Sequence, residues 1–159
     1  MKNTESHLVF RIKDQLFSVN VDHVSSIIQL PKLFKVPQAP DYISGVINVE
    51  GDVIPVVDSG IKIKMDPIQL SELSQVVILQ RNIQEGNKMN RMGFLVDEVD
   101  DVSDFDPLKI KPLPTSKFHF DERMVDGMHK IGEDFAMQIN VENLFTEDID
   151  ALFEDNNTK

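Results

Sequence analysis

The stretch PQAPDYISGVINVEGDVIPVVD, residues 37–58, holds the clearest structural signals in this chain of 159 residues. Residues 43–58 predict a β-hairpin whose turn lies at Glu50-Gly51-Asp52, because Gly51 can supply the positive φ of a tight turn. Pro55 has no amide hydrogen to donate to a neighbouring strand. We therefore expect its strand to be an edge strand, or to be bulged at Pro55.

Alternating apolar residues predict more strands on both sides of this stretch. HLVFRI (7–12) and LFSVNV (16–21) alternate across a short polar turn and predict an N-terminal hairpin. QVVILQRN (75–82) and MGFLVDEV (92–99) predict a second strand pair, and KIGEDFAMQINV (130–141) predicts a last hairpin. Short strands with frequent turns favour a sandwich or small barrels over βαβ units.

The segments between these strands receive other predictions. Asp22 can cap a short helical turn that carries Val24, Ile27 and Ile28 on one side. Prolines interrupt the segment that follows that turn and the acidic segment 100–122, and both are predicted to be irregular. In the tail, residues 142–153 space their apolar side chains like one face of a helix. Residues 1–6 and 154–159 are expected to be flexible.

A sequence pattern occurs twice. VDHVSSI (21–27) and VDEVDDV (96–102) share V-D-x-V-x-x-[IV] at a spacing of 75 residues. Pro112 follows Pro37 at the same spacing, and Gly127 follows Gly45 by 82 residues. The order of these landmarks predicts an internal duplication. Two similar five-stranded barrels, approximately 7–70 and 75–145 with possible strand exchange, would share an apolar seam because each is too small to bury much alone.

The composition excludes several classes of protein. The net charge of −11 argues against a nucleic-acid or anionic-membrane partner. The chain contains no cysteine, so disulfides and thiolate chemistry are excluded. There is no signal-peptide pattern and no apolar run long enough for membrane insertion, and cytoplasmic residence is the expectation. No phosphate-binding glycine motif, nucleophile elbow or acid–base pair suggests an enzyme.

Four stretches in this order, 7–27, 36–58, 94–102 and 124–145, resemble CheW-like chemotaxis coupling proteins. The resemblance extends over about residues 7–153, and residues 37–58 are its most specific part. It implies an all-β fold of two five-stranded SH3-like β-barrel subdomains that share a hydrophobic core, with a short C-terminal helix. It also implies a non-catalytic adaptor that links the cytoplasmic tip of methyl-accepting chemoreceptors to the regulatory domain of a CheA-like histidine kinase.

The chain departs from the family pattern at charged positions. Ser26 stands where the family usually has Glu, and Glu50 stands where it usually has Arg. Ser59-Gly60 replaces a usual Leu-Arg pair after Val57-Asp58. The family's Glu and first Arg are associated with the receptor-facing surface. Their loss here is either a paired change or the sign of a different receptor set.

The resemblance carries seven positions over as partner-facing or partner-shaping residues. They are Val24, Ser26, Ile27, Gly45, Asn48, Glu50 and Gly51. A second hypothesis is a regulatory protein that senses a small molecule in a pocket between the barrels. A divergent enzyme ranks far below both.

Neither the acidic residues nor the histidines predict a metal site, and no cofactor is expected. One group contains Asp97, Glu98, Asp100, Asp101, Asp104 and Asp106. Its spacing does not match a Ca²⁺-binding loop, so a solvated acidic face is expected. His119 near Asp121 and Glu122, and His129 near Asp126, lack the spacing of zinc motifs and are expected to be surface histidines.

Overall fold

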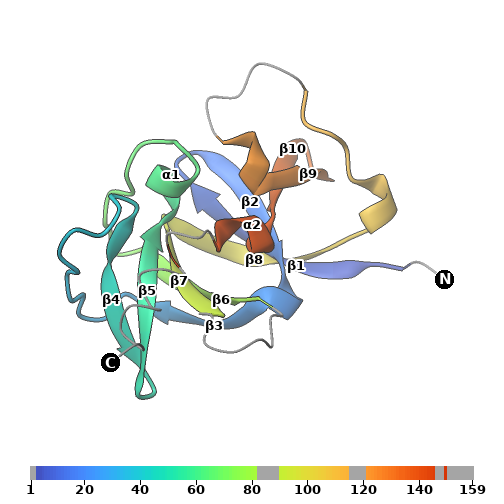
Figure 1. Cartoon of the computed structure of the whole chain (residues 1–159). Helices are drawn as coiled ribbons and strands as arrows, with labels where there is room; N and C mark the ends of the chain where they lie inside the picture. Colours follow the sequence, from blue (N-terminus) through green and yellow to red (C-terminus); the bar gives the residue numbers. More distant parts are fainter. Residues whose placement is uncertain (1–2, 82–89, 115–120, 146–148, 150–159) are drawn as a thin grey trace.

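The computed structural model describes residues 3–81, 90–114 and 121–145 together with Ile149. Its strands form two five-stranded sheets (Figure 1). The first sheet has the strand order β8 (Glu98–Phe105), β1 (Glu5–Ile12), β2 (Gln15–Asn20), β10 (Asp134–Ile139) and β9 (Val125–Ile131). The second sheet has the order β3 (Val24–Gln29), β6 (Gln75–Gln80), β7 (Arg91–Val96), β5 (Asp52–Asp58) and β4 (Ile43–Val49).

Helical segments in the described residues are short. They are α1 (Ser59–Lys62), α2 (Val141–Leu144) and the 3-10 turns η1 (Val21–His23), η2 (Pro107–Lys109) and η3 (Glu122–Met124). The predicted all-β fold class is confirmed, and the two sheets are consistent with two SH3-like barrels. Within the described residues, no helix is both long enough and apolar enough to span a membrane.

Both sheets follow the same pairing rule. In the first sheet, β1 pairs with β2 and β8 antiparallel, and β2 pairs with β10 parallel. In the second sheet, β6 pairs with β7 and β3 antiparallel, and β7 pairs with β5 parallel. The strands β9 and β4 then pair antiparallel with β10 and β5. Each sheet thus combines the first hairpin of one half of the chain with the last three strands of the other half.

Small irregularities repeat in the same way. Ser25 of β3 and Asp100 of β8 have no counterpart on the neighbouring strand, and each forms a bulge near the start of its strand. These two residues are 75 residues apart, the spacing of the repeated sequence pattern. The strand pairing therefore supports the internal duplication.

Two glycines mark equivalent close approaches of the backbone. A Cβ at Gly45 would lie 2.7 Å from the carbonyl oxygen of Phe34, and a Cβ at Gly127 would lie 2.7 Å from that of Lys111. In each half, the crossing segment forms an isolated bridge to the residue after the glycine. Neither position has room for a side chain, which explains why both repeats contain glycine.

One hydrophobic core is shared by both sheets. Phe10 of β1 and Phe94 of β7 meet edge to face, with ring centroids 6.1 Å apart and planes at 82°. Phe17 of β2 stacks on Phe10 at 6.4 Å, and all three rings are 0% exposed. The buried cluster around these rings includes apolar residues from both sheets. The expected shared core is confirmed.

The first sheet also has a smaller apolar cluster on its other face. It contains Val9, Leu16, Phe105 and Ala136. Successive side chains of a strand point to opposite faces. For this reason Val9 joins the small cluster while its neighbour Phe10 joins the main core.

The strand β3 corrects the prediction of a helical turn capped by Asp22. The side chain of Asn20 caps η1 by accepting a hydrogen bond from the backbone N–H of Asp22. Residues Val24–Gln29 then alternate between half-buried and exposed. Val24 and Ile28 pack against the core, whereas Ile27 faces solvent. Valine and isoleucine are well suited to a pleated, half-buried strand, and this preference outweighs the helical spacing.

Strand β8 corrects the prediction that residues 100–122 are irregular throughout. Asp100, Asp101 and Asp104 are exposed, while Val99 and Phe105 pack against the two apolar clusters. Charges on an edge strand discourage pairing with another chain. The many charged residues of β8 hide the alternation of apolar and polar side chains by which a strand is recognised in a sequence.

Pro55 lies in an inner strand, so the prediction of an edge or a bulge at this residue is wrong. Its partner on β4 is Val46. The backbone N–H and C=O of Val46 form hydrogen bonds with Phe34 and not with β5. The pairing of β5 with β7 begins only at Val56. The ladder therefore needs no amide hydrogen at Pro55.

The described residues include parts of the N-terminal segment and of the predicted tail helix. β1 begins at Glu5, so the expected flexibility of residues 1–6 is wrong from Glu5 onward. The predicted tail helix, 142–153, overlaps α2 and the helical, fully buried Ile149. Its residues 146–148 and 150–153 lie outside the described residues, as do 154–159.

Candidate functional site

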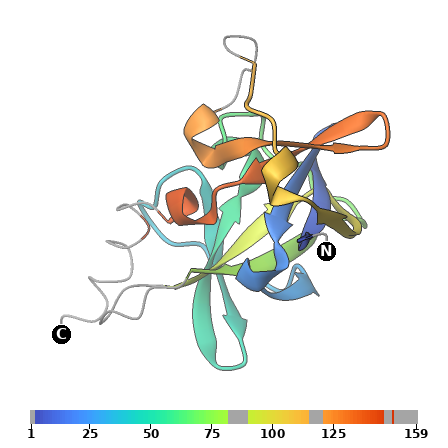
Figure 2. The same ribbon diagram turned by 90° about the vertical axis from the view of Figure 1, so that its right-hand side faces the viewer.

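The seven predicted partner residues lie on opposite edges of the second sheet. Val24, Ser26 and Ile27 belong to β3, whereas Gly45 and Asn48 belong to β4 and Glu50-Gly51 forms the turn after it. The strand order separates β3 from β4 by three strands. In Figures 1 and 2, however, β3 and the β4–β5 turn both lie on the lower side of the molecule.

The β3 residues divide into shaping and exposed positions. Val24 packs against the core, Ser26 is half-buried opposite Ile78, and Ile27 is 39% exposed. β3 is an edge strand whose outer side has no neighbour in the described sheet. An exposed edge with a protruding isoleucine can accept a protein partner.

A loop beside β3 adds two exposed leucines that the sequence analysis did not single out. Leu70 is 63% exposed and Leu73 is 59% exposed. A cavity of about 450 Å³ lies between this loop and the end of β3, where Gln29 and Leu30 line it. Ile27 shares the outward face of β3 with Gln29. We call Ile27, Leu30, Leu70 and Leu73 the β3-edge patch.

Hydrogen bonds within the loop hold these leucines outward. The Oγ of Ser74 accepts from the N–H of Ser71 at 2.9 Å, and the Oγ of Ser71 accepts from the N–H of Leu73 at 3.1 Å. The N–H of Ser74 also donates to the carbonyl oxygen of Ser71 at 3.2 Å. Two leucines within the polar run QLSELS (69–74) were the available sequence signal.

The β4–β5 turn presents the second group of predicted residues. Glu50 and Gly51 both have positive φ, 52° and 88°, as in the tight turns that favour hairpins. The side-chain oxygen of Asn48 accepts from the N–H of Gly51 at 3.0 Å. Asp52 forms an ion pair with Arg91 at the start of β7. Asn48 and Gly51 therefore set the shape of the turn, and Glu50 places an exposed negative charge at its tip.

Gly60, where the family usually has Arg, has no room for a side chain. A Cβ at this position would lie 2.0 Å from the carbonyl oxygen of Asp66. Asp58, just before α1, accepts hydrogen bonds from the backbone N–H groups of Ile61 within α1 and of Ile68 after it. These bonds hold the segment around Gly60 in place. The absence of a charged side chain at this position therefore comes with a backbone approach that leaves no space for one.

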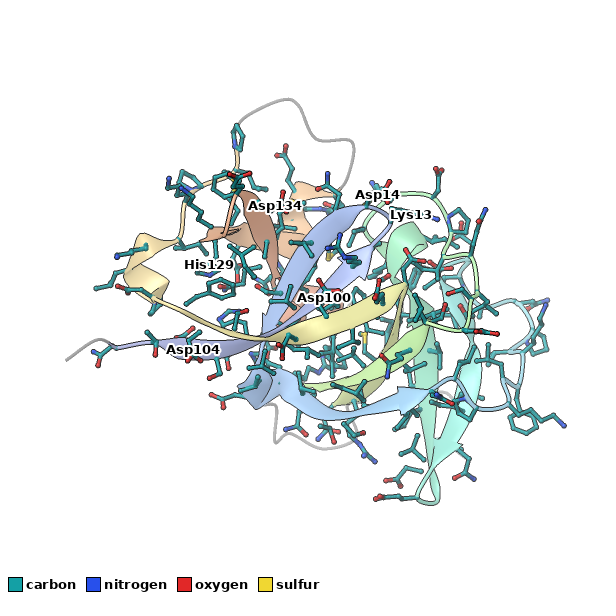
Figure 3. All side chains as sticks on the ribbon, turned by 180° about the vertical axis from the view of Figure 1, so that it is seen from behind. Lys13, Asp14, Asp100, Asp104, His129 and Asp134 are labelled. Atoms are coloured by element: carbon teal, nitrogen blue, oxygen red, sulfur yellow. The ribbon has the colours of Figure 1, made fainter. Side chains whose placement is uncertain are left out.

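The acidic residues form a solvated edge in the described structure. Asp100 pairs with Arg11 at 3.4 Å, Asp104 accepts from Ser6 at 2.6 Å, and Asp97 accepts from the N–H of Lys13 at 2.5 Å. Figure 3 shows Asp100 and Asp104 spread along β8. Within the described residues, no group of three or more histidine or carboxylate side chains could hold a metal ion.

The histidines differ from the surface sites that were expected. His129 is only 3% exposed, so its prediction as a surface histidine is wrong. It reaches Asp126 through Gln138, by hydrogen bonds of 2.8 and 3.0 Å. His119 lies outside the described residues. Its neighbour Asp121 pairs with Arg123, and this guanidinium lowers the pKa of the Asp121 carboxyl.

The cavities give the small-molecule hypothesis little support. Two of about 410 and 430 Å³ are lined by the first sheet and its loops, and the third lies beside β3 in the second sheet. None of these three is lined by residues of both sheets.

Comparison with known proteins connects this fold to one family. Residues 6–148 match the model of the CheW-like domain. A probable chemotaxis protein CheW from Rhizobium etli is 29% identical over 140 residues, which cover 88% of this chain and 86% of that protein. The chemotaxis protein CheW of Rhizobium meliloti is 28% identical over 153 residues, covering 91% and 95%.

A solved structure shows the same fold. The crystal structure of the scaffolding protein TtCheW from Thermoanaerobacter tengcongensis superposes with a TM-score of 0.80 at 23% identity, covering 94% of this chain and 92% of that one. The match extends through both five-stranded sheets. The chain therefore belongs to the CheW-like domain family, and this membership confirms the predicted class of a non-catalytic chemotaxis adaptor.

Proposed function

We propose that the protein couples the cytoplasmic tip of a methyl-accepting chemoreceptor to the regulatory domain of a CheA-like histidine kinase. Membership in the CheW-like family supports this role, and we place the protein in the cytoplasm on the same ground. We further propose that residues 7–153 act as one unit, since each sheet takes strands from both halves of the chain.

The observation that carries the receptor assignment is the exposed β3-edge patch. Receptor tips are helical, and an amphipathic helix binds by placing its apolar side chains into a hydrophobic groove. Leu30 and Leu70 line the cavity, the exposed Leu73 lies in the same loop, and the exposed Ile27 lies on the strand that ends at the cavity. This gives a partner helix both protruding side chains and a recess.

The other predicted residues surround or shape this face. Val24 supports β3 from the core side, and Ser26 lies beside Ile27 at the strand edge. Asn48, Glu50 and Gly51 form the projecting β4–β5 turn (Figure 2), while the buried Gly45 lets the crossing segment approach β4. In this proposal Glu50 contacts the receptor at the rim, where charge sets partner choice and association rate.

An adaptor needs a separate surface for its second partner. We assign the kinase regulatory domain to the outer strands away from the β3-edge patch, so that both partners bind at once. Binary titrations test this arrangement. The Kd for the regulatory domain should stay within about twofold when a receptor-tip fragment saturates the protein, because the two surfaces do not overlap.

Two outcomes would overturn the proposal. One is mutually exclusive binding, in which the receptor fragment displaces the kinase domain. The other is binding to neither protein combined with a rise in melting temperature on adding a cytosolic metabolite, which would favour a small-molecule sensor.

A further inference from the structure

Two histidines from strands far apart in sequence meet inside the first sheet. His7 of β1 is 0% exposed and His129 of β9 is 3% exposed, with ring centroids 5.3 Å apart. Phe105 of β8 stacks on His129 at 4.5 Å and meets His7 edge to face at 5.3 Å. We call His7 and His129 the histidine pair. Figure 3 shows His129 on the side of the first sheet away from the second sheet.

The hydrogen bonds of His7 fit a neutral ring. Its Nε2 lies 3.4 Å from a carboxylate oxygen of Glu5, which can only accept, so Nε2 carries the hydrogen. Its Nδ1 lies 3.2 Å from the hydroxyl oxygen of Ser18, which donates to it. Protonation of Nδ1 would give two N–H groups and would force the Ser18 hydroxyl to reverse its role.

The surroundings of His129 fix the orientation of its ring. The side-chain nitrogen of Gln138 donates to Asp126 at 3.0 Å, so its oxygen faces His129 and accepts from Nε2 at 2.8 Å. His129 also lines the cavity that Asp104, Asp106 and Lys130 share.

Charged groups of both signs surround the pair. Glu5, with a 44% exposed side chain, is the carboxylate in contact with His7. Beside His129, Asp104 and Asp106 share a cavity with Lys109, Lys111 and Lys130. β2 contributes the neutral Ser18 and β10 the neutral Gln138. Burial lowers the pKa of His7, the hydrogen bond with Glu5 opposes this, and the neighbouring His129 lowers it further.

The cost of protonation falls on the outer strands of the first sheet. The pair packs around Phe105, which belongs to the small cluster and not to the main core. Phe105 and His129 come from β8 and β9, the two edge strands of the first sheet. An edge strand is paired on one side only, and it can open without unfolding the rest of a protein.

From these contacts we propose that the histidine pair makes the first sheet acid-sensitive, so that mild acidification opens β8 and β9 locally while the second sheet stays folded. The opened strands let the His7 ring reach water, where it can take up a proton. This inference is independent of the proposed partners.

Proton linkage gives the direction in which pH shifts the equilibrium between the closed and the open first sheet. An imidazole that is hard to protonate in the closed sheet binds its proton more tightly once the sheet has opened. The closed form is therefore most favoured above the ordinary histidine pKa of about 6.5 and is progressively lost as the pH falls below it. At pH 5.5 the ratio of open to closed sheet should rise by roughly tenfold if His7 stays neutral in the closed form.

Amide hydrogen exchange on the full chain at pH 7.5 and 5.5, corrected for intrinsic exchange rates, tests the proposal. Protection in β8 and β9 should fall by at least about tenfold, whereas protection in β6 and β7 should change by less than about twofold. The variant His7→Gln keeps a donor toward Glu5 but cannot titrate, so it should reduce the acid-induced loss. His23→Gln is the matched control, because His23 lies in η1 outside the pair and its removal should leave the loss intact.

Equal loss of protection in both sheets, no loss at pH 5.5, or an undiminished loss in His7→Gln would each overturn the proposal. If His7→Gln fails to fold at pH 7.5, imidazole titration by NMR on the unchanged chain decides. A His7 ring that stays neutral below pH 6 supports acid sensitivity, and one that titrates at or above pH 6.5 ends it.

Discussion

Phe10 and Phe94 meet edge to face at a centroid distance of 6.1 Å, although they belong to different sheets. Each ring is fully buried, and each lies on a strand of a central hairpin, β1–β2 or β6–β7. This contact is the centre of the core that both sheets share. It joins two small units into one body that can hold two docking surfaces in a fixed relation.

The variant Phe94→Ala should therefore destabilise both sheets together. Removing a buried ring costs about 3–5 kcal/mol of unfolding free energy. Urea unfolding followed by amide probes in each sheet should show one common transition at lower urea. Phe135→Ala is the control, since Phe135 is 40% exposed and its loss should cost below about 1 kcal/mol. Separate transitions for the two sheets would contradict a shared core.

The internal duplication predicts equal effects at two distant glycines. Gly45→Ala and Gly127→Ala place a Cβ at the same 2.7 Å from a backbone oxygen. Each should lower the unfolding free energy by about 2–4 kcal/mol, because the backbone has to move. Denaturant titration measures both costs.

Gly132→Ala serves as the control for these variants. Gly132 has φ 60° but open space around its Cβ position, so only the conformational cost of about 1 kcal/mol applies. If Gly45→Ala or Gly127→Ala is as mild as this control, the two close approaches are not the reason that both repeats contain glycine.

The β3-edge patch predicts a binding defect without a stability defect. Leu73→Ser removes an exposed apolar side chain and should raise the Kd for a receptor-tip fragment by about tenfold, since an apolar anchor commonly contributes over 1 kcal/mol. Fluorescence anisotropy measures the affinity, and thermal melting should be unchanged. Leu108→Ser is the matched control, because Leu108 is 91% exposed in η2, in the first sheet's β8–β9 connection. An equal defect in both variants would remove Leu73 from the receptor site.

The charge at the β4–β5 tip predicts a change in association kinetics. Glu50→Arg should speed binding to receptor tips with a net negative charge and slow binding to positively charged ones, because rim charges steer encounter. Stopped-flow measurements at low salt should show the difference, and 1 M salt should abolish it. Glu133→Arg, at the exposed tip of the β9–β10 hairpin, provides the comparison. A rate that ignores the charge of Glu50 at low salt would exclude it from the interface.

Much of the fold could be predicted because the signals were local or repeated. The hairpin around Gly51 has a turn residue with positive φ between two apolar runs. The paired positions of Gly45 and Gly127 exposed the duplication, because a backbone approach that excludes every side chain leaves a mark in the sequence. The all-β class and the shared core followed from these patterns.

Other features could not be read from local patterns. β8 was missed because the charges that protect an edge strand conceal its alternation. Leu70 and Leu73 were missed because exposure depends on how a loop is held, here by hydrogen bonds between Ser71 and Ser74. The contact of His7 with His129 arises from the parallel pairing of β2 with β10, which joins the two ends of the chain. Spacing in sequence carries no information about such a meeting.

Sedimentation velocity tests most directly whether the protein bridges the receptor and the kinase. A CheA regulatory domain and a receptor-tip fragment, each at a concentration where they do not bind one another, should form a single ternary species in sedimentation velocity when this protein is added. Binary complexes that never combine, or two partners that stay separate in its presence, would contradict the adaptor account.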